Sequence, residues 1–156
     1  GYDGYYCGKQ DDMQALAETF ASADGYIIGT PVHESNVSGL LKSFFDRCRP
    51  FTFSPNPLFD CKVGCAAAVG GGRNGGQEKA LLAIRSFYLL HQILVCSNGL
   101  DGKLGVALWS RDGGTAGIRK DTEALQELST LGKNLAETTW VFKYGQAVAH
   151  GRGSYA

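Results

Sequence analysis

The feature that most constrains the fold is an uncharged run of residues that ends in a cluster of glycines. Residues 63–69 (VGCAAAV) are small and apolar, the pattern of a strand buried on both faces. The next seven residues, 70–76 (GGGRNGG), include five glycines, and Gln77 and Glu78 then begin a helical pattern. Glycine costs conformational entropy, so such a cluster is typical of a loop that needs positive φ angles or close backbone approach. Residues 70–76, the glycine loop, are therefore predicted to bind a ligand at the carboxyl end of a buried strand.

Length and charge exclude several classes of protein. A chain of 156 residues predicts one globular domain, and 15 basic against 15 acidic residues indicate no nucleic-acid or anionic-membrane partner. No apolar run approaches the roughly 20 residues that a spanning helix needs. The five cysteines are an odd number, which favours buried thiols in a reducing, cytoplasmic compartment over a disulfide framework.

Helical and strand patterns alternate along the chain, which is typical of an α/β fold with a parallel sheet. Proline-rich residues 50–60 are predicted to be irregular, and we expect a domain over residues 1–143 followed by a loose glycine-rich tail over 144–156. The predicted helices span 11–23, 38–48, 77–91 and 120–141, and the predicted strands span 26–30, 63–69, 93–96 and 103–109. A polar loop follows the 26–30 strand and the glycine loop follows the 63–69 strand. If these strands are neighbours, the two loops form one crevice.

Three segments, residues 23–47, 69–91 and 117–137, carry a resemblance to a known family. They resemble the flavodoxin-like NADPH-dependent FMN reductases, most closely the branch that includes the iron–sulfur flavoproteins. Residues 23–47 (ADGYIIGTPVHESNVSGLLKSFFDR) are similar to the second flavin loop of that family, and residues 69–91 to its third loop and the helix that follows. Residues 117–137 are similar to its last helix. The resemblance implies a doubly wound parallel sheet in three layers.

The resemblance also implies an FMN-dependent oxidoreductase that passes electrons from NAD(P)H or a reduced carrier to a small-molecule or protein acceptor. The residues expected to line the isoalloxazine and ribityl side are Pro31, Val32, His33, Ser35, Asn36, Val37 and Ser38. Those expected to present backbone N–H groups to the pyrimidine edge are Gly70, Gly71, Gly72, Arg73, Gly75, Gly76 and Gln77. We expect no catalytic side chain, because the reacting atoms belong to the flavin. Such proteins commonly hold flavin at a subunit boundary, so a homo-oligomer is expected, with residues 80–91 as a candidate subunit face.

The chain departs from the family at its beginning. The family has a first strand and a Ser/Thr-rich loop that grips the FMN phosphate, and nothing before Asp11 resembles them. We expect the sequence to be the later part of a longer protein, because a buried parallel strand without its neighbour leaves backbone groups unpaired. The alternative is a remnant that cannot hold FMN tightly.

Cys7 precedes Asp11, Asp12 and Met13 with a spacing that resembles the last ligand of the cluster in iron–sulfur flavoproteins. A 4Fe–4S cluster needs four thiolates, and the other cysteines are scattered between Cys48 and Cys96. Cys7 is therefore a candidate metal ligand, and a free cysteine in a loop is the alternative.

Two other functions fit parts of the sequence. Residues 70–75 also match the G-x-G-x-x-G pattern of NAD-binding Rossmann domains, but the acidic residue expected roughly 20 positions later is missing. The absence of the first loop also favours a truncated assembly module without a complete flavin site.

Overall fold

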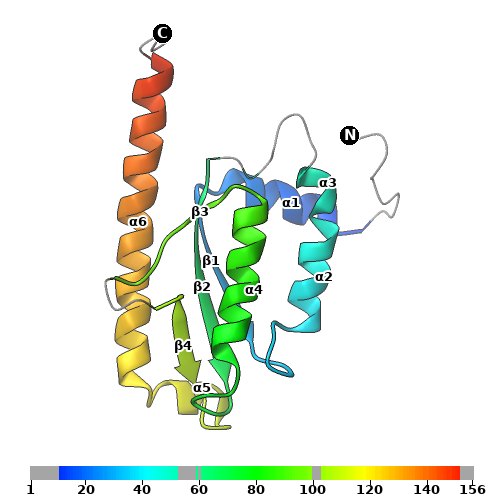
Figure 1. Cartoon of the computed structure of the whole chain (residues 1–156), viewed down its shortest axis with the longest axis vertical. Helices are drawn as coiled ribbons and strands as arrows, with labels where there is room; N and C mark the ends of the chain where they lie inside the picture. Colours follow the sequence, from blue (N-terminus) through cyan, green and yellow to red (C-terminus); the bar gives the residue numbers. More distant parts are fainter. Residues whose placement is uncertain (1–10, 53–58, 60, 100–102, 152–156) are drawn as a thin grey trace.

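The computed structural model describes residues 11–52, 59, 61–99 and 103–151 of the chain. Its elements in chain order are α1 (Met13–Ser22), β1 (Gly25–Pro31), α2 (Gly39–Arg47), α3 (Arg49–Thr52), β2 (Val63–Gly70), α4 (Gln77–Leu90), β3 (Leu94–Val95), β4 (Val106–Trp109), α5 (Gly114–Ile118) and α6 (Thr122–Gly151). The predicted α/β alternation is present (Figure 1). No helix in the described part of the chain is long and apolar enough to cross a membrane.

β2 is the central strand of a four-stranded parallel sheet. β1 pairs with it from Gly25 opposite Val63 to Pro31 opposite Val69. β3 pairs with the first two residues of β2, and β4 with its last four. Since β1 occupies one edge of β2 along seven residues, β3 and β4 lie end to end along the other edge. The two strands that precede the predicted ligand loops are therefore neighbours.

Helices cover both faces of the sheet and make three layers, as predicted. On one face, α1, α2 and α4 pack against β1 and β2 through a cluster that includes Tyr26, Ala66 and Phe87. On the other face, α6 packs against β2 and β4 through a second cluster that includes Cys65 and Leu131. The burial of seven of the eight residues of β2 follows from its place between these clusters.

Local sequence explains where α2 begins, whereas three other segments differ from the prediction. Ser38 caps α2 by accepting a hydrogen bond from the Leu41 N–H at 3.2 Å. α3 forms inside the segment predicted to be irregular because Pro50 lies in its first turn, where its missing N–H needs no partner. α5 forms where a glycine turn was expected. α6 continues ten residues past the predicted end at residue 141, to Gly151, because residues 141–151 are mostly apolar or good helix formers. This helix crosses the predicted boundary between domain and tail.

β1 is covered less completely than β2. Its residues alternate between buried and exposed, and Ile27 is 46% exposed on the face that α6 covers only in part. Among the described residues, β2 is the only strand that pairs with β1. One edge of β1 therefore has free backbone groups within this part of the chain.

His91 is expected to make the fold sensitive to acid. It is 6% exposed, and its ring centroid lies 4.5 Å from that of Phe87 and 5.0 Å from that of Phe59. Burial lowers the pKa of His91 from 6.5 to about 4, because the charged imidazolium is penalised there. The unfolded chain therefore binds this proton more readily than the folded chain. The free energy of unfolding should fall, by on the order of 2 kcal/mol, as the pH drops from about 6.5 to about 4.

Urea unfolding at several pH values tests this expectation. His91→Leu should remove most of the loss of stability over this pH range. His33→Leu is the matched control, because His33 is exposed and its replacement should leave the slope unchanged. An unchanged slope in His91→Leu would contradict the assignment.

Candidate functional site

The two predicted ligand loops meet at the carboxyl edge of the sheet. The loop over residues 31–38, here called the 31–38 loop, leads from β1 to α2, and the glycine loop leads from β2 to α4. Gly76 has a φ of +100°, and a Cβ atom built on it would lie 2.6 Å from the Cα atom of Ser35. The two loops are therefore in direct backbone contact, as expected for neighbouring parallel strands.

The 31–38 loop is built around a tight turn. The His33 N–H donates to the Asn36 carbonyl at 3.0 Å, and the Asn36 N–H donates to the His33 carbonyl at 2.9 Å. Between them, Glu34 and Ser35 have positive φ values of 47° and 58°. Such angles are uncommon for residues other than glycine and store strain, which often marks a functional loop.

Side chains of the 31–38 loop divide into an exposed set and a structural set. Pro31, His33, Ser35 and Asn36 are exposed. Val37 is 6% exposed and belongs to the core, Val32 packs against that core, and Ser38 caps α2. The exposed set is available to a ligand, whereas the structural set holds the loop in place.

The glycine loop has its first three carbonyl groups bonded to the protein. The Gly70 carbonyl accepts from the Ser110 N–H at 2.9 Å and from the Ser110 hydroxyl at 3.1 Å. The Gly71 carbonyl accepts from the indole N–H of Trp109 at 2.7 Å. The Gly72 carbonyl accepts from the Gln77 side-chain amide at 2.6 Å.

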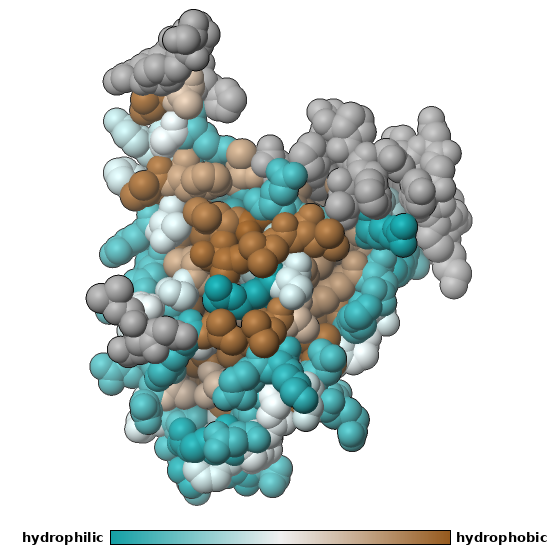
Figure 2. All heavy atoms as spheres, in the orientation of Figure 1, coloured by the Kyte–Doolittle hydropathy of each residue, from teal (hydrophilic) through white to brown (hydrophobic). Residues whose placement is uncertain are grey.

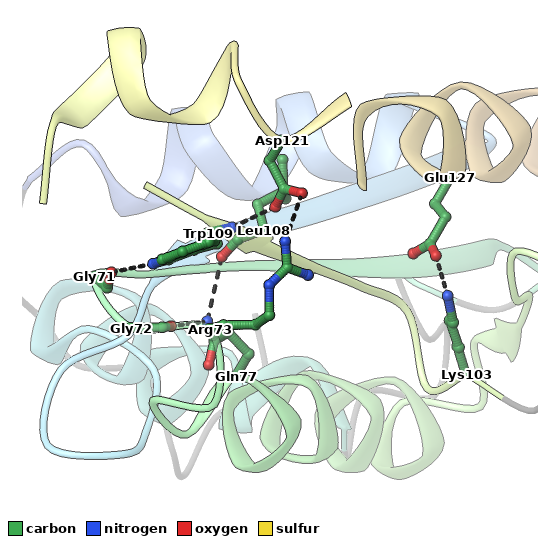
Figure 3. Close-up of polar contacts among 9 residues, drawn as sticks. All are labelled: Gly71, Gly72, Arg73, Gln77, Lys103, Leu108, Trp109, Asp121 and Glu127. Carbon is green, nitrogen blue, oxygen red and sulfur yellow. Dashed lines mark hydrogen bonds and ion pairs between the residues drawn. The ribbon is translucent and has the colours of Figure 1, made fainter. Parts of the chain in front are cut away.

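Gln77 is an internal support of the loop. Its side chain is 0% exposed. Besides the bond to Gly72, Nε2 donates to the Leu108 carbonyl at 3.3 Å (Figure 3). Oε1 accepts from the Gly75 N–H at 2.8 Å. The side chain of Gln77 is thus fully engaged inside the loop.

Asp121 is a second support, which no pattern in the sequence predicted. Its carboxylate is 3% exposed and accepts from the Trp109 backbone N–H at 2.9 Å. It also accepts from the Arg73 guanidinium at 3.3 Å, so it links the glycine loop to the segment before α6 (Figure 3). The Trp109 ring packs against two guanidinium groups, at 4.9 Å from Arg73 and 3.8 Å from Arg111. These contacts join residues far apart in sequence, so no local sequence pattern predicts them.

A third loop, residues 110–113 after β4, completes this edge. It turns through Arg111 and Asp112, whose φ values are 54° and 55°. A Cβ atom on Gly71 would lie 2.1 Å from the Asp112 carboxylate, so this loop contacts the glycine loop. The paired glycines 113 and 114 after a strand were the available sequence signal for a further ligand loop.

The amide groups of the glycine loop are arranged differently from its carbonyls. Across the part of the loop that the structure describes, the N–H groups of residues 71–74 donate to no protein acceptor. Residues 72–75 are exposed, and a Cβ atom on Gly72 would meet nothing closer than 4.0 Å. With the carbonyls of residues 70–72 bonded to the protein and the amides of residues 71–74 free, the loop presents hydrogen-bond donors that suit an anionic or electron-rich group.

The structure does not test the metal prediction. Cys7 lies outside the described residues. Among residues 11–52, 59, 61–99 and 103–151, no three His, Cys, Asp or Glu side chains are grouped to hold a metal ion.

Proteins of known family and structure are similar to this chain. The family model described as NADPH-dependent FMN reductase matches residues 2–100. An iron–sulfur flavoprotein of Methanocaldococcus jannaschii is 43% identical over 123 residues, which are 78% of this chain and 62% of that protein. An iron–sulfur flavoprotein of Archaeoglobus fulgidus is 39% identical over 132 residues, which are 84% of this chain and 67% of that protein. The chain thus spans about two thirds of the length of these relatives.

Solved structures agree on the fold. The Trp repressor binding protein from Bacillus subtilis superposes with a TM-score of 0.63 at 23% identity, over 79% of this chain and 73% of that one. An NADH:FMN oxidoreductase in its apo form superposes with a TM-score of 0.59 at 18% identity, over 82% of this chain and 60% of that one. These likenesses support the flavodoxin-like α/β architecture.

Proposed function

The chain belongs to the NADPH-dependent FMN reductase family, and from this premise we propose that it binds FMN where the 31–38 loop meets the glycine loop. We propose further that it acts as an oxidoreductase, passing electrons from NAD(P)H or a reduced carrier to a small-molecule or protein acceptor. Names of the relatives support this proposal, since several are iron–sulfur flavoproteins and one, 29% identical, is a flavodoxin.

The observation that carries the proposal is the set of free amides over residues 71–74. FMN, when bound, supplies the redox chemistry of such a site, and its pyrimidine edge is electron-rich. Residues 71–74 would donate hydrogen bonds to that edge, and the exposed side chains of the 31–38 loop would cover the ring and ribityl side. Donors that are fixed before binding favour the negative charge that accumulates there on reduction. Gln77 and Asp121 would act by holding the loop.

Gly72→Ala tests this placement of FMN. Its new methyl group meets no atom closer than 4.0 Å, so the free energy of unfolding should stay unchanged. The methyl group projects from the exposed loop beside the free amides, so FMN affinity should fall at least about tenfold. Fluorescence titration of FMN measures the affinity, and urea unfolding measures the stability.

Gly132→Ala is the matched control, because it adds a methyl group with no atom within 4 Å at a site in α6 remote from the glycine loop. Equal FMN affinity in Gly72→Ala and the unchanged chain would contradict the proposed location. Failure of the unchanged chain to bind FMN would contradict the flavoprotein proposal and favour the assembly module. Oxidation of NADH and of NADPH with bound FMN then tests the electron donor.

Membership of this family supports two further proposals, one about the sheet and one about Cys7. A further strand, outside the described residues, would pair with the open edge of β1 and complete the sheet near the phosphate of FMN. Cys7 would be one ligand of a 4Fe–4S cluster, tested by absorption near about 400 nm that dithionite bleaches.

We also propose a homo-oligomer that uses the outer surface of α4. Leu82, Leu89 and Leu90 are 49%, 69% and 65% exposed on this helix. Figure 2 shows hydrophobic residues gathered on this face of the molecule. Exposed apolar patches of this kind often mark interfaces. Sedimentation velocity measures the assembly, and a monomer at all concentrations would contradict it.

A further inference from the structure

Two cysteines occupy adjacent positions on β2 and at the end of β3. Gly64 is paired with Val95 in a parallel ladder, so the next residues in register are Cys65 and Cys96. The Cys96 N–H donates to the Gly64 carbonyl at 2.9 Å, which continues the pairing past the end of β3. Neighbouring strands lie about 4.8 Å apart, within the Cα separation of roughly 4.4–6.8 Å that a disulfide spans. Side chains at paired positions of parallel strands also point to the same face.

The two thiols differ in their access to solvent. Cys65 is 0% exposed, in the cluster between the sheet and α6, and Cys96 packs against this cluster. Cys96 is partly exposed and lines an open groove of about 400 Å³ together with Asn134 and Thr138. A reagent can therefore reach Cys96 through the groove, whereas Cys65 is closed to solvent.

The environment keeps Cys65 as a thiol. Burial raises the pKa of Cys65 far above its usual value, and the adjacent Cys96 thiol raises it further. The Cys96 sulfur also lies 3.6 Å from the Thr138 hydroxyl oxygen. The first attack on an oxidant is therefore expected from the partly exposed sulfur.

We propose that Cys96 is a thiol-modification site and that Cys65 is its resolving partner. Reaction with a low-molecular-weight disulfide would join the two cysteines in a reversible disulfide bond. In the first step, the Cys96 thiolate attacks one sulfur of glutathione disulfide. The bond between the two glutathione sulfurs breaks, and the leaving thiolate takes up a proton. In the second step, the Cys65 sulfur attacks the Cys96 sulfur and the bond between Cys96 and glutathione breaks. The proton of Cys65 passes to the departing glutathione thiolate. Two cysteine thiols are thereby oxidised by two electrons, and one glutathione disulfide is reduced to two thiols.

The disulfide would link the two ends of the segment that contains the glycine loop. Residues 66–95, between the two cysteines, contain the glycine loop and all of α4. A covalent link across this crossover restricts the unfolded chain. The oxidised protein should therefore unfold at a temperature higher by a few degrees, and dithiothreitol should reverse the shift.

The experiment is oxidation of the full chain with glutathione disulfide, followed by alkylation and peptide mapping. The expected product is a peptide pair joined through Cys65 and Cys96, with no glutathione retained on either residue. Cys65→Ala should instead retain one glutathione on Cys96, and Cys96→Ser should leave Cys65 as a free thiol. Far-ultraviolet circular dichroism checks that each variant is folded.

Cys48→Ser is the matched control, because Cys48 is equally buried but lies in the other core cluster. It should form the Cys65–Cys96 bond as readily as the unchanged chain. The proposal is overturned if the unchanged, folded chain keeps glutathione on Cys96 without forming the bond. It is equally overturned if Cys96 stays a free thiol while Cys61, which is also partly exposed, is modified.

Discussion

Replacing Gly76 with alanine should separate the two loops of the candidate site and abolish FMN binding. Gly76 has a φ of +100°, and an added Cβ would lie 2.6 Å from the Cα and 2.8 Å from the Cβ of Ser35. The strain of a positive φ at alanine adds to the clash of its Cβ with the Ser35 backbone, which cannot rotate away. We expect a loss of roughly 3 kcal/mol in the free energy of unfolding. FMN affinity should fall below detection, because the two loops of the proposed site are held apart where Gly76 now meets Ser35.

Urea unfolding of the apoprotein and fluorescence titration of FMN measure the two effects. Gly99→Ala separates the strain of a positive φ from the clash with a neighbour. Gly99 has a φ of +128° but no atom within 4 Å of an added Cβ. The difference between the two variants reports the contact with Ser35. If Gly76→Ala loses no more stability than Gly99→Ala, the close approach of the loops is wrong.

Replacing Gln77 should damage the glycine loop from inside. Gln77→Leu removes the donor to the carbonyls of Gly72 and Leu108 and the acceptor for the Gly75 N–H. Buried polar groups left without partners cost about 1–3 kcal/mol, and we expect a loss of stability in this range. FMN affinity should fall by about ten- to a hundredfold, since the loop amides lose their fixed direction.

Gln77→Glu gives a sharper test of the same contacts. Its carboxylate retains the acceptor for Gly75 but faces the carbonyls of Gly72 and Leu108, so the pKa of the new side chain should be raised. A folded-state pKa above the unfolded value makes the variant most stable at low pH and progressively less stable as the pH rises. The free energy of unfolding of Gln77→Glu should thus fall further below that of the unchanged chain as the pH rises toward neutral, as measured by urea unfolding. Gln126→Glu, at an exposed position of α6, should show no such trend, and equal pH profiles would contradict the role of Gln77.

The elements around the candidate site could be predicted because their signals are local. The uncharged run before the glycine loop forms the buried central strand, and Gln77 begins α4 where the helical pattern begins. Ser38 caps α2 within a few residues of its own position. Such signals depend on backbone preference and hydrophobic periodicity, which act over a few residues. The end of α6 was misplaced for the same reason, because the glycines of the tail, beginning with Gly145, locally predicted a stop, whereas the helix continues to Gly151.

The alternation of strands and helices and the positions of the two loops were expected from sequence. The pairing of β1 with β2 and the supports of the site were decided by tertiary contacts. The ligand-contact role predicted for Gln77 remains a prediction, whereas the structure shows its side chain bonded inside the loop. Asp121 reaches Trp109 and Arg73 across 12 and 48 residues of sequence. Cys65 and Cys96 become neighbours only when β3 pairs with β2.

The sequence by itself therefore determined the α/β class, the buried central strand and the glycine loop. Only the tertiary structure decided which carbonyls of that loop are bonded, which amides remain free, and which thiols meet. The physical reason is that strand and loop preferences are properties of short segments, whereas hydrogen-bond partners depend on the packing of distant ones.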